Sequence, residues 1–132
     1  MTQLSVQTTK RSEMLDITRQ VADVVRRTGI GRGLCHVFVP HTTAAVTINE
    51  NADPDVPVDI LTVLDRLIPH EGGYRHQEGN TAAHVKASLL GPSETVLIEG
   101  GELVLGVWQS LFFCEFDGPR PRKIIVRVQA TD

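Results

Sequence analysis

The ten residues VWQSLFFCEF, at positions 107–116, are typical of a β-strand, and they decide the fold class. Side chains of a strand point alternately to its two faces. One face carries Gln109, Leu111, Phe113 and Glu115, and the other carries Trp108, Ser110, Phe112 and Cys114. Polar groups on an apolar face need partners, which a cleft or a subunit interface supplies. Alternatively, this face is simply solvated, which is common in antiparallel sheets.

Further strands are expected on both sides of this one. Apolar runs bounded by turn residues predict strands at 4–9, 34–39, 43–49, 95–99, 102–105 and 123–129. Gly100-Gly101 predicts a hairpin, and Gly118-Pro119 predicts another turn. Strands joined by short turns pair antiparallel. The pattern therefore predicts an α+β fold with mostly antiparallel strands, formed by a single domain over residues 1–132.

Three helices are expected between these strands. The first begins at Ser12, which serves as its N-cap, and ends at Gly29. It is predicted from five apolar residues at helical spacing: Leu15, Ile17, Val21, Val24 and Val25. The second covers residues 58–67 and follows the start signal Asp53-Pro54. The third covers residues 82–90 and ends at Gly91-Pro92. Residues 69–81 form a glycine-rich loop.

Composition excludes several classes of protein. The chain of 132 residues is too short for a TIM barrel, and its net charge of −3 argues against a nucleic-acid binder. No apolar run approaches the length of a membrane span, and the polar first ten residues predict no signal peptide. The only cysteines, Cys35 and Cys114, lie in apolar runs. We therefore expect free, buried thiols and a cytoplasmic protein.

Three histidines are candidates for a metal site. His41 follows a strand break, His76 lies in the glycine-rich loop, and His84 lies on the helix after it. Three imidazoles and a water form an open zinc site of the catalytic type. The spacing matches no standard zinc motif, so three separate polar histidines remain the alternative.

Two groups of polar residues are candidates for acid–base chemistry. Glu50 and Asn49 precede the second helix, and Gln109 and Glu115 lie on the strand quoted above. A carboxylate in such a place can act as a general base or can orient a ligand histidine. Helix capping and a solvated sheet face are the alternatives.

Cations near the histidines are candidates for binding a phosphate. Arg75 and Lys86 flank two of the histidines, Arg120 follows Gly118-Pro119, and Ser88 adds a hydroxyl. Guanidinium groups match the geometry of phosphate oxygens. The chain has no phosphate-binding loop of the Walker or GxGxxG type, so side chains would have to hold any phosphate. An ordinary cationic rim is the alternative.

Four ordered blocks resemble the YjbQ-like family, also named the secondary thiamine-phosphate synthase family. The first block runs from His41-Thr42-Thr43-Ala44-Ala45 to Asn49-Glu50-Asn51-Ala52-Asp53-Pro54. The second holds Tyr74-Arg75-His76, Asn80 and 84–91, HVKASLLG. The third holds Ser93 to Gly101, Gly106, Trp108-Gln109 and Leu111, and the fourth is Glu115-Phe116-Asp117-Gly118-Pro119-Arg120. Val107 departs from the threonine that the family usually has.

The resemblance implies a two-sheet sandwich with two to three helices that trimerises around a threefold axis. It also implies a divalent metal, usually zinc, with His41, His76 and His84 as ligands. It also makes five polar residues candidates for acid–base chemistry or for hydrogen bonds to the ligand histidines: Glu50, Asn49, Asp53, Gln109 and Glu115.

These expectations combine into a metal-dependent enzyme that acts on a small phosphorylated or heterocyclic substrate. Thiamine-phosphate synthesis releases pyrophosphate and favours Mg²⁺ with oxygen ligands, whereas three histidines suit zinc better. We therefore expect that synthesis as a side activity at most. The alternative is a trimer that binds a metal or a small ligand without catalysis.

Overall fold

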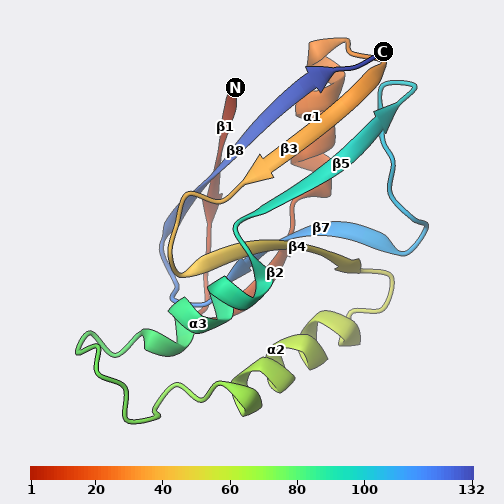
Figure 1. Cartoon of the computed structure of the whole chain (residues 1–132). Coiled ribbons are helices and arrows are strands. Elements are labelled where there is room, and N and C mark those ends of the chain that lie inside the picture. The colour runs from red at the N-terminus through yellow and green to blue at the C-terminus, as the bar shows by residue number, and fades with distance from the viewer.

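Two antiparallel sheets face each other in the computed structural model, which describes residues 1–132 (Figure 1). The elements in chain order are β1 (Thr2–Gln7), β2 (Glu13–Asp16), α1 (Thr18–Thr28), β3 (Arg32–Phe38), β4 (Ala44–Glu50), α2 (Asp55–Leu67), α3 (Thr81–Leu90), β5 (Ser93–Glu99), β6 (Glu102–Leu103), β7 (Gln109–Glu115) and β8 (Pro121–Ala130). The predicted α+β class is confirmed. None of the three helices has the length and hydropathy that crossing a bilayer requires.

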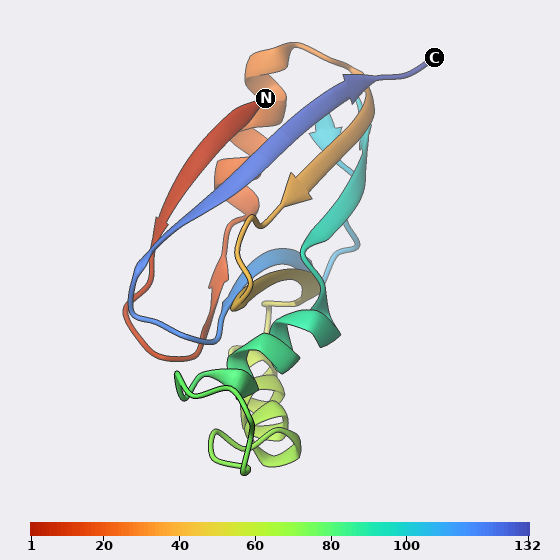
Figure 2. The same cartoon turned by 60° about the vertical axis from the view of Figure 1, so that its left-hand side comes forward.

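The larger sheet has five strands in the order β1-β8-β3-β5-β6, and the smaller has three in the order β2-β7-β4. All neighbouring strands are antiparallel. Gly100 and Gly101 close the predicted β5–β6 hairpin with φ of 59° and 76°, which glycine adopts without strain. In Figures 1 and 2 both termini lie at the end of the molecule opposite α2 and α3.

The main core fills the space between the sheets. Helix α1 contributes Val21, Val24 and Val25, all buried, against Val37 of β3 and Phe113 of β7. Full burial of side chains of this size stabilises the folded state by about 1.5–3 kcal/mol each. This apolar face therefore holds α1 against the sheets.

A second core lies on the outer face of the small sheet. Ala83 and Ala87 of α3 pack with Ala45 of β4 and with Phe112 and Cys114 of β7. The small sheet is thus covered on both faces at its centre, which explains why both faces of β7 carry apolar side chains. Both cysteines are buried and free, as expected, and burial raises the pKa of the Cys114 thiol to about 12.

The prediction that the first helix begins at Ser12 is wrong. Residues Glu13 to Asp16 form β2 and pair with β7, and α1 begins only at Thr18. The Asp16 carboxylate accepts a hydrogen bond from the backbone N–H of Thr18 (2.9 Å). Pairing with an exposed strand edge overrode the helical spacing of the apolar residues. The other elements lie within three residues of their predicted ranges.

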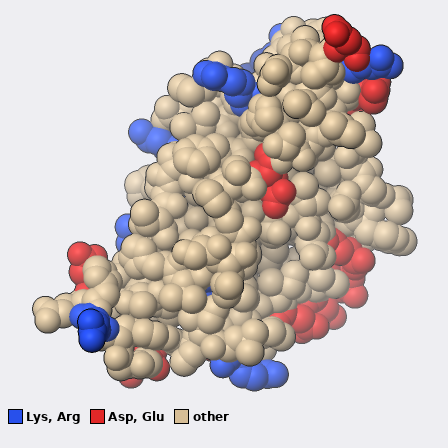
Figure 3. All heavy atoms as spheres, viewed as in Figure 1, with Lys and Arg blue, Asp and Glu red and all other residues tan.

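Helix α2 differs from the others because none of its residues is buried. Val58, Val63 and Leu67 are 58%, 46% and 72% exposed. In Figure 3 the face over β5 and the two lower helices carries few charges, and acidic groups gather near the start of α2. The helix therefore presents apolar side chains to solvent in a single chain.

Candidate functional site

His41 lies in the connection between β3 and β4, where its hydrogen bond defines its protonation state. Its Nε2 accepts a hydrogen bond from the backbone N–H of Lys123 (2.9 Å). Burial, together with the nearby charge of Arg122, lowers the pKa of His41 below its ordinary 6.5. A neutral imidazole that accepts at Nε2 carries its proton on Nδ1. His41 is therefore a neutral group whose remaining nitrogen is a donor.

His76 and His84 meet at the start of α3. Their ring centroids lie 5.5 Å apart, and the planes cross at 86°. The first turn of α3 holds His84, whose N–H bonds to the carbonyl of Asn80 (3.3 Å). His76 comes from the loop and lies 3.7 Å from a carboxylate oxygen of Glu78, a contact that is ionic only when the imidazole is protonated. The fold therefore joins two of the three predicted ligands.

A third ligand does not join this pair within one chain. No group of three or more histidine, cysteine, aspartate or glutamate side chains is placed so that it could hold a metal ion. The hydrogen bond from Lys123 also occupies the only lone pair of neutral His41. Because catalytic zinc sites use three protein ligands, the pair is one ligand short. A metal bound by all three histidines stays a prediction.

The β7–β8 connection positions Arg120 beside the start of α3. Asp117 accepts from Asn80 Nδ2 (2.9 Å) and from Arg120 Nη2 (3.1 Å), and its carbonyl accepts from Arg120 Nε (2.8 Å). Two buried oxygens here have no hydrogen-bond partner, Oδ1 of Asn80 and Oγ1 of Thr81. Arg120 also lines an open depression of about 540 Å³ together with His41 and Thr42.

Glu115 is fully buried in an ion pair with Arg122. One carboxylate oxygen accepts from Arg122 Nε (2.9 Å) and Thr8 Oγ1 (2.7 Å), and the other from Arg122 Nη2 and the N–H of Asp117. Arg122 Nη2 also donates to Thr43 Oγ1 (2.9 Å). Burial alone would raise the pKa of Glu115, but the hydrogen bonds from Arg122 and Thr8 bring it below its ordinary value. The geometry therefore favours a structural role for Glu115, as a carboxylate that stays charged, over a role in proton transfer.

The other three candidates for acid–base chemistry lie at the far end of the small sheet. Glu50 pairs with Gln109 in the β4–β7 register, whereas Glu115 pairs with Ala44. These two ends of β4 are about 20 Å apart at strand spacing. The amide oxygens are used locally, since Asn49 accepts from the N–H of Glu50 (2.7 Å) and Gln109 accepts from that of Gly106 (2.8 Å). The four candidates therefore do not form one cluster in a single chain.

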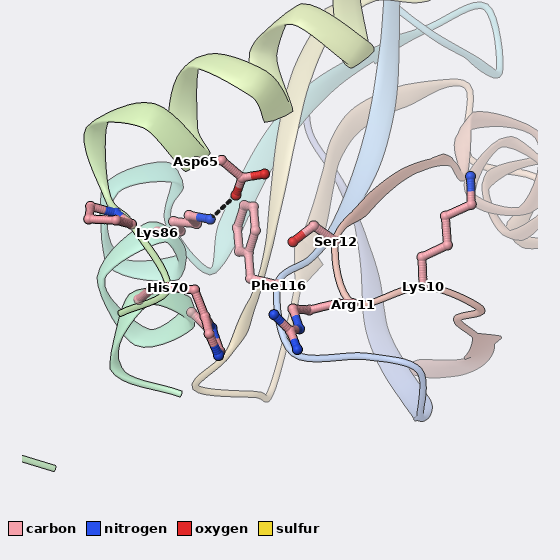
Figure 4. Close-up of a pocket in the computed structure, with 10 residues that line it drawn as sticks. Lys10, Arg11, Ser12, Asp65, His70, Lys86 and Phe116 are labelled. Atoms are coloured by element: carbon pink, nitrogen blue, oxygen red, sulfur yellow. Dashed lines mark hydrogen bonds and ion pairs between the residues drawn. The ribbon is translucent and has the colours of Figure 1, made fainter. Parts of the chain in front are cut away.

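The four phosphate candidates also lie apart. Arg75 is exposed in the loop, and the hydroxyl of Ser88 donates to the carbonyl of His84 (2.9 Å). Arg120 bonds to Asp117, as described, whereas Lys86 is buried and bonds to Asp65. Lys86 lines a separate cleft (Figure 4).

Sequence reasoning missed the other residues of that cleft. They include Lys10, Arg11, Ser12 and His70. The basic pair Lys10-Arg11 was the one available signal.

Comparisons with known proteins agree over nearly the whole length. Residues 2–131 match the family profile described as UPF0047 protein YjbQ-like. The UPF0047 protein YugU of Bacillus subtilis is 52% identical over 126 residues, covering 95% of this chain and 96% of that protein. A UPF0047 protein of Methanocaldococcus jannaschii is 46% identical over 123 residues, covering 93% and 89%.

Solved structures show the same fold. An uncharacterised conserved protein of the YjbQ/UPF0047 family from Clostridium acetobutylicum superposes with a TM-score of 0.96 at 50% identity, covering 98% of this chain and 100% of that one. A conserved hypothetical protein of Thermus thermophilus superposes with a TM-score of 0.91 at 42% identity, again covering 98% and 100%.

Proposed function

This chain belongs to the UPF0047 YjbQ-like family, and from that premise we propose that it is a metal-dependent enzyme acting on a small phosphorylated or heterocyclic substrate. The observation that carries the proposal is the meeting of His76 and His84, whose rings lie 5.5 Å apart. Imidazole nitrogens are suitable ligands for a divalent transition metal, and zinc is the metal that we propose first. A bound zinc would lower the pKa of a water or polarise a substrate oxygen.

The third metal ligand requires a change from the single-chain geometry. Either His41 gives up its hydrogen bond to Lys123, or another copy of the chain supplies a ligand. We therefore include a homotrimer in the proposal. The apolar side chains that α2 exposes support assembly, since a contact between copies would bury them. A cytoplasmic location fits the two free thiols.

Two residues that line one depression, Arg120 and His41, would bind and orient the substrate. Arg120 is held by Asp117 through two nitrogens, and its remaining N–H groups suit a phosphate. His41 adds a neutral Nδ1–H donor in the same depression. Glu115 holds Arg122, which lines the same depression. Thiamine-phosphate synthesis would then be a side activity of this site.

Metal content tests the proposal directly. We would measure zinc per chain by elemental mass spectrometry after purification without a chelating tag, in the wild type and in His76→Ala and His84→Ala. We expect about one zinc per chain in the wild type and loss of the metal in both variants. His36→Ala is the matched control, because His36 lies on β3 and bonds to Thr95 (3.1 Å). Stoichiometric zinc in both variants would contradict the proposal.

A non-catalytic ligand-binding trimer is the second candidate. The observation that favours it is the separation of Glu50, Asn49 and Gln109 from Glu115, at opposite ends of the small sheet. Glu50→Gln distinguishes the two candidates in a turnover screen with phosphate esters and pyrophosphates. An enzyme that uses Glu50 would lose turnover while keeping metal and fold, and a binding protein would change little.

A further inference from the structure

A second cleft, lined by Lys86 of α3, includes neither His76 nor His84. It has a volume of about 490 Å³, and it separates the residues of α2 and α3 from the β1–β2 connection (Figure 4). Its polar lining consists of Lys10, Arg11, Ser12, Asp65, His70 and Lys86. We name it the Lys86 cleft.

Lys86 is the buried cation of this cleft. Its side chain is only 6% exposed, although it carries a charge, and its Nζ bonds to Asp65 Oδ1. The ammonium also lies 5.9 Å from the centre of the Phe116 ring. An ammonium has three donors, and a carboxylate on one side uses one of them. Because Asp65 is 63% exposed, solvent weakens the one ion pair that Lys86 has.

The two cations of the β1–β2 connection, Lys10 and Arg11, have no partner of their own. Neither these two side chains nor the His70 imidazole forms an ion pair or a side-chain hydrogen bond. In Figure 4 the guanidinium of Arg11 turns toward His70, and the hydroxyl of Ser12 turns toward Phe116. Lys10 extends away from them along the rim.

The backbone that carries these cations is fixed in place. The carbonyl of Arg11 accepts a hydrogen bond from the N–H of Gly118 (3.0 Å). A Cβ at position 118 would lie 2.3 Å from the carbonyl oxygen of Lys10, so only glycine allows this close approach. The cations are thus presented by a packed connection, which lowers the entropy cost of binding.

The charges of the cleft call for an anion. Arg11 and Lys86 line the cleft and Lys10 lies at its rim, against the single carboxylate of Asp65, in a chain whose net charge is −3. Such a local excess of positive charge attracts and concentrates anions. Arg11 can bind two oxygens at once, and Ser12 supplies a neutral donor.

We propose that the Lys86 cleft binds a phosphate group, either as free inorganic phosphate or on a small phosphorylated molecule. Arg11 and Lys86 supply the charge, and Ser12 supplies a hydrogen bond. Asp65 competes with the anion for Lys86 and so sets the affinity. This site shares no residue with the histidine pair and needs no bound metal.

Calorimetric titration with inorganic phosphate and with glycerol 3-phosphate, at constant ionic strength, tests this site. We expect Arg11→Ala to weaken binding about tenfold, because it removes a charged hydrogen-bond donor. Asp65→Asn should strengthen binding, because it removes the competing carboxylate. A Lys86–Asp65 pair with a purely structural role predicts no gain in Asp65→Asn. Arg127→Ala, an exposed cation on β8, is the matched control and should bind as the wild type does.

The outcomes separate the sources of the phosphate. Equal affinity for both probes assigns the cleft to free phosphate, and tighter binding of the ester assigns it to a phosphorylated molecule. The proposal is overturned if neither probe binds in the millimolar range, if Asp65→Asn binds no more tightly, or if Arg127→Ala weakens binding as much as Arg11→Ala. Zinc content in Arg11→Ala should equal that of the wild type, so failure of this site and failure of the metal site are distinguishable.

Discussion

The two buried cations of this molecule are paired in different ways. Arg122 and its partner Glu115 are both buried, with side chains 3% and 0% exposed. Lys86 is equally buried at 6%, but its partner Asp65 is 63% exposed. The first pair is completed by the hydroxyls of Thr8 and Thr43, whereas the second opens onto a cleft.

The difference indicates which charge can meet a ligand. A closed pair has its main donors and acceptors satisfied by the protein, so it contributes to the fold and offers little to a small molecule. An open pair keeps part of its charge available. Lys86 therefore belongs to a binding surface, and Arg122 belongs to the framework that holds the connection around Asp117.

Breaking the closed pair should have the largest effect. Arg122→Met leaves the carboxylate of Glu115 buried without a cation, so we expect the free energy of unfolding to fall by about 3–5 kcal/mol. Urea denaturation followed by circular dichroism measures it. Replacing both partners, with Arg122→Met and Glu115→Leu together, should recover part of the loss. A single-variant cost under about 1 kcal/mol, the value typical of surface pairs, would show that the pair is not closed.

Breaking the open pair should cost less and should depend on salt. We expect Asp65→Asn to lower the free energy of unfolding by about 1 kcal/mol, since solvent screens the exposed carboxylate. In about 1 M salt the Debye length falls to about 3 Å, so most of the difference should vanish. Asp23→Asn, in the exposed pair with Arg26, is the matched control and should change stability still less. A loss of stability that salt does not reduce would show that Lys86 and Asp65 form a closed pair, as Arg122 and Glu115 do.

The smallest expected effect is a dependence on pH. The pKa of Glu115 is lowered in the folded state, mainly by hydrogen bonds from Arg122 and Thr8 working against burial. Because the folded pKa is lowered, the ionised carboxylate stabilises the fold at pH values above the pKa of the unfolded state, near 4.5. This contribution is lost as the pH falls through the pKa of the folded state.

Denaturation curves measured at several pH values test this predicted loss of stability at low pH. Between pH values just above and well below 4.5, the wild type should lose more stability than Glu115→Gln, because the amide does not titrate. Parallel curves for the two proteins would show that Glu115 titrates alike in the folded and unfolded states.

Much of the fold was predictable, because it rests on local signals. Alternation and turn residues located the strand over residues 107–116 and the Gly100-Gly101 hairpin to within two residues. The predicted helix start at Ser12 was wrong for a reason that the sequence does not contain. Residues 13–16 have helical spacing with α1, yet their backbone pairs with β7 because that strand edge was free. Local periodicity carries no information about which strand edge is open.

The candidate site was predictable only in part. The residue types were recognised, and His76 does meet His84. The cluster of acid–base groups did not form, because Glu50 and Glu115 occupy opposite ends of β4. Arg11 and His70 were not recognised, because neither lies beside Lys86 in the chain.

The sequence by itself determined the α+β class, the positions of most strands and helices, and the family, because periodicity, turn chemistry and ordered motifs act over short stretches of chain. Only the tertiary structure decided which charges are neighbours. Glu115 reaches Arg122 across a connection, and Lys86 faces Arg11 across a cleft. Such contacts depend on strand register and helix packing, which join segments distant in sequence, and they determine whether a buried charge is structural or free to bind.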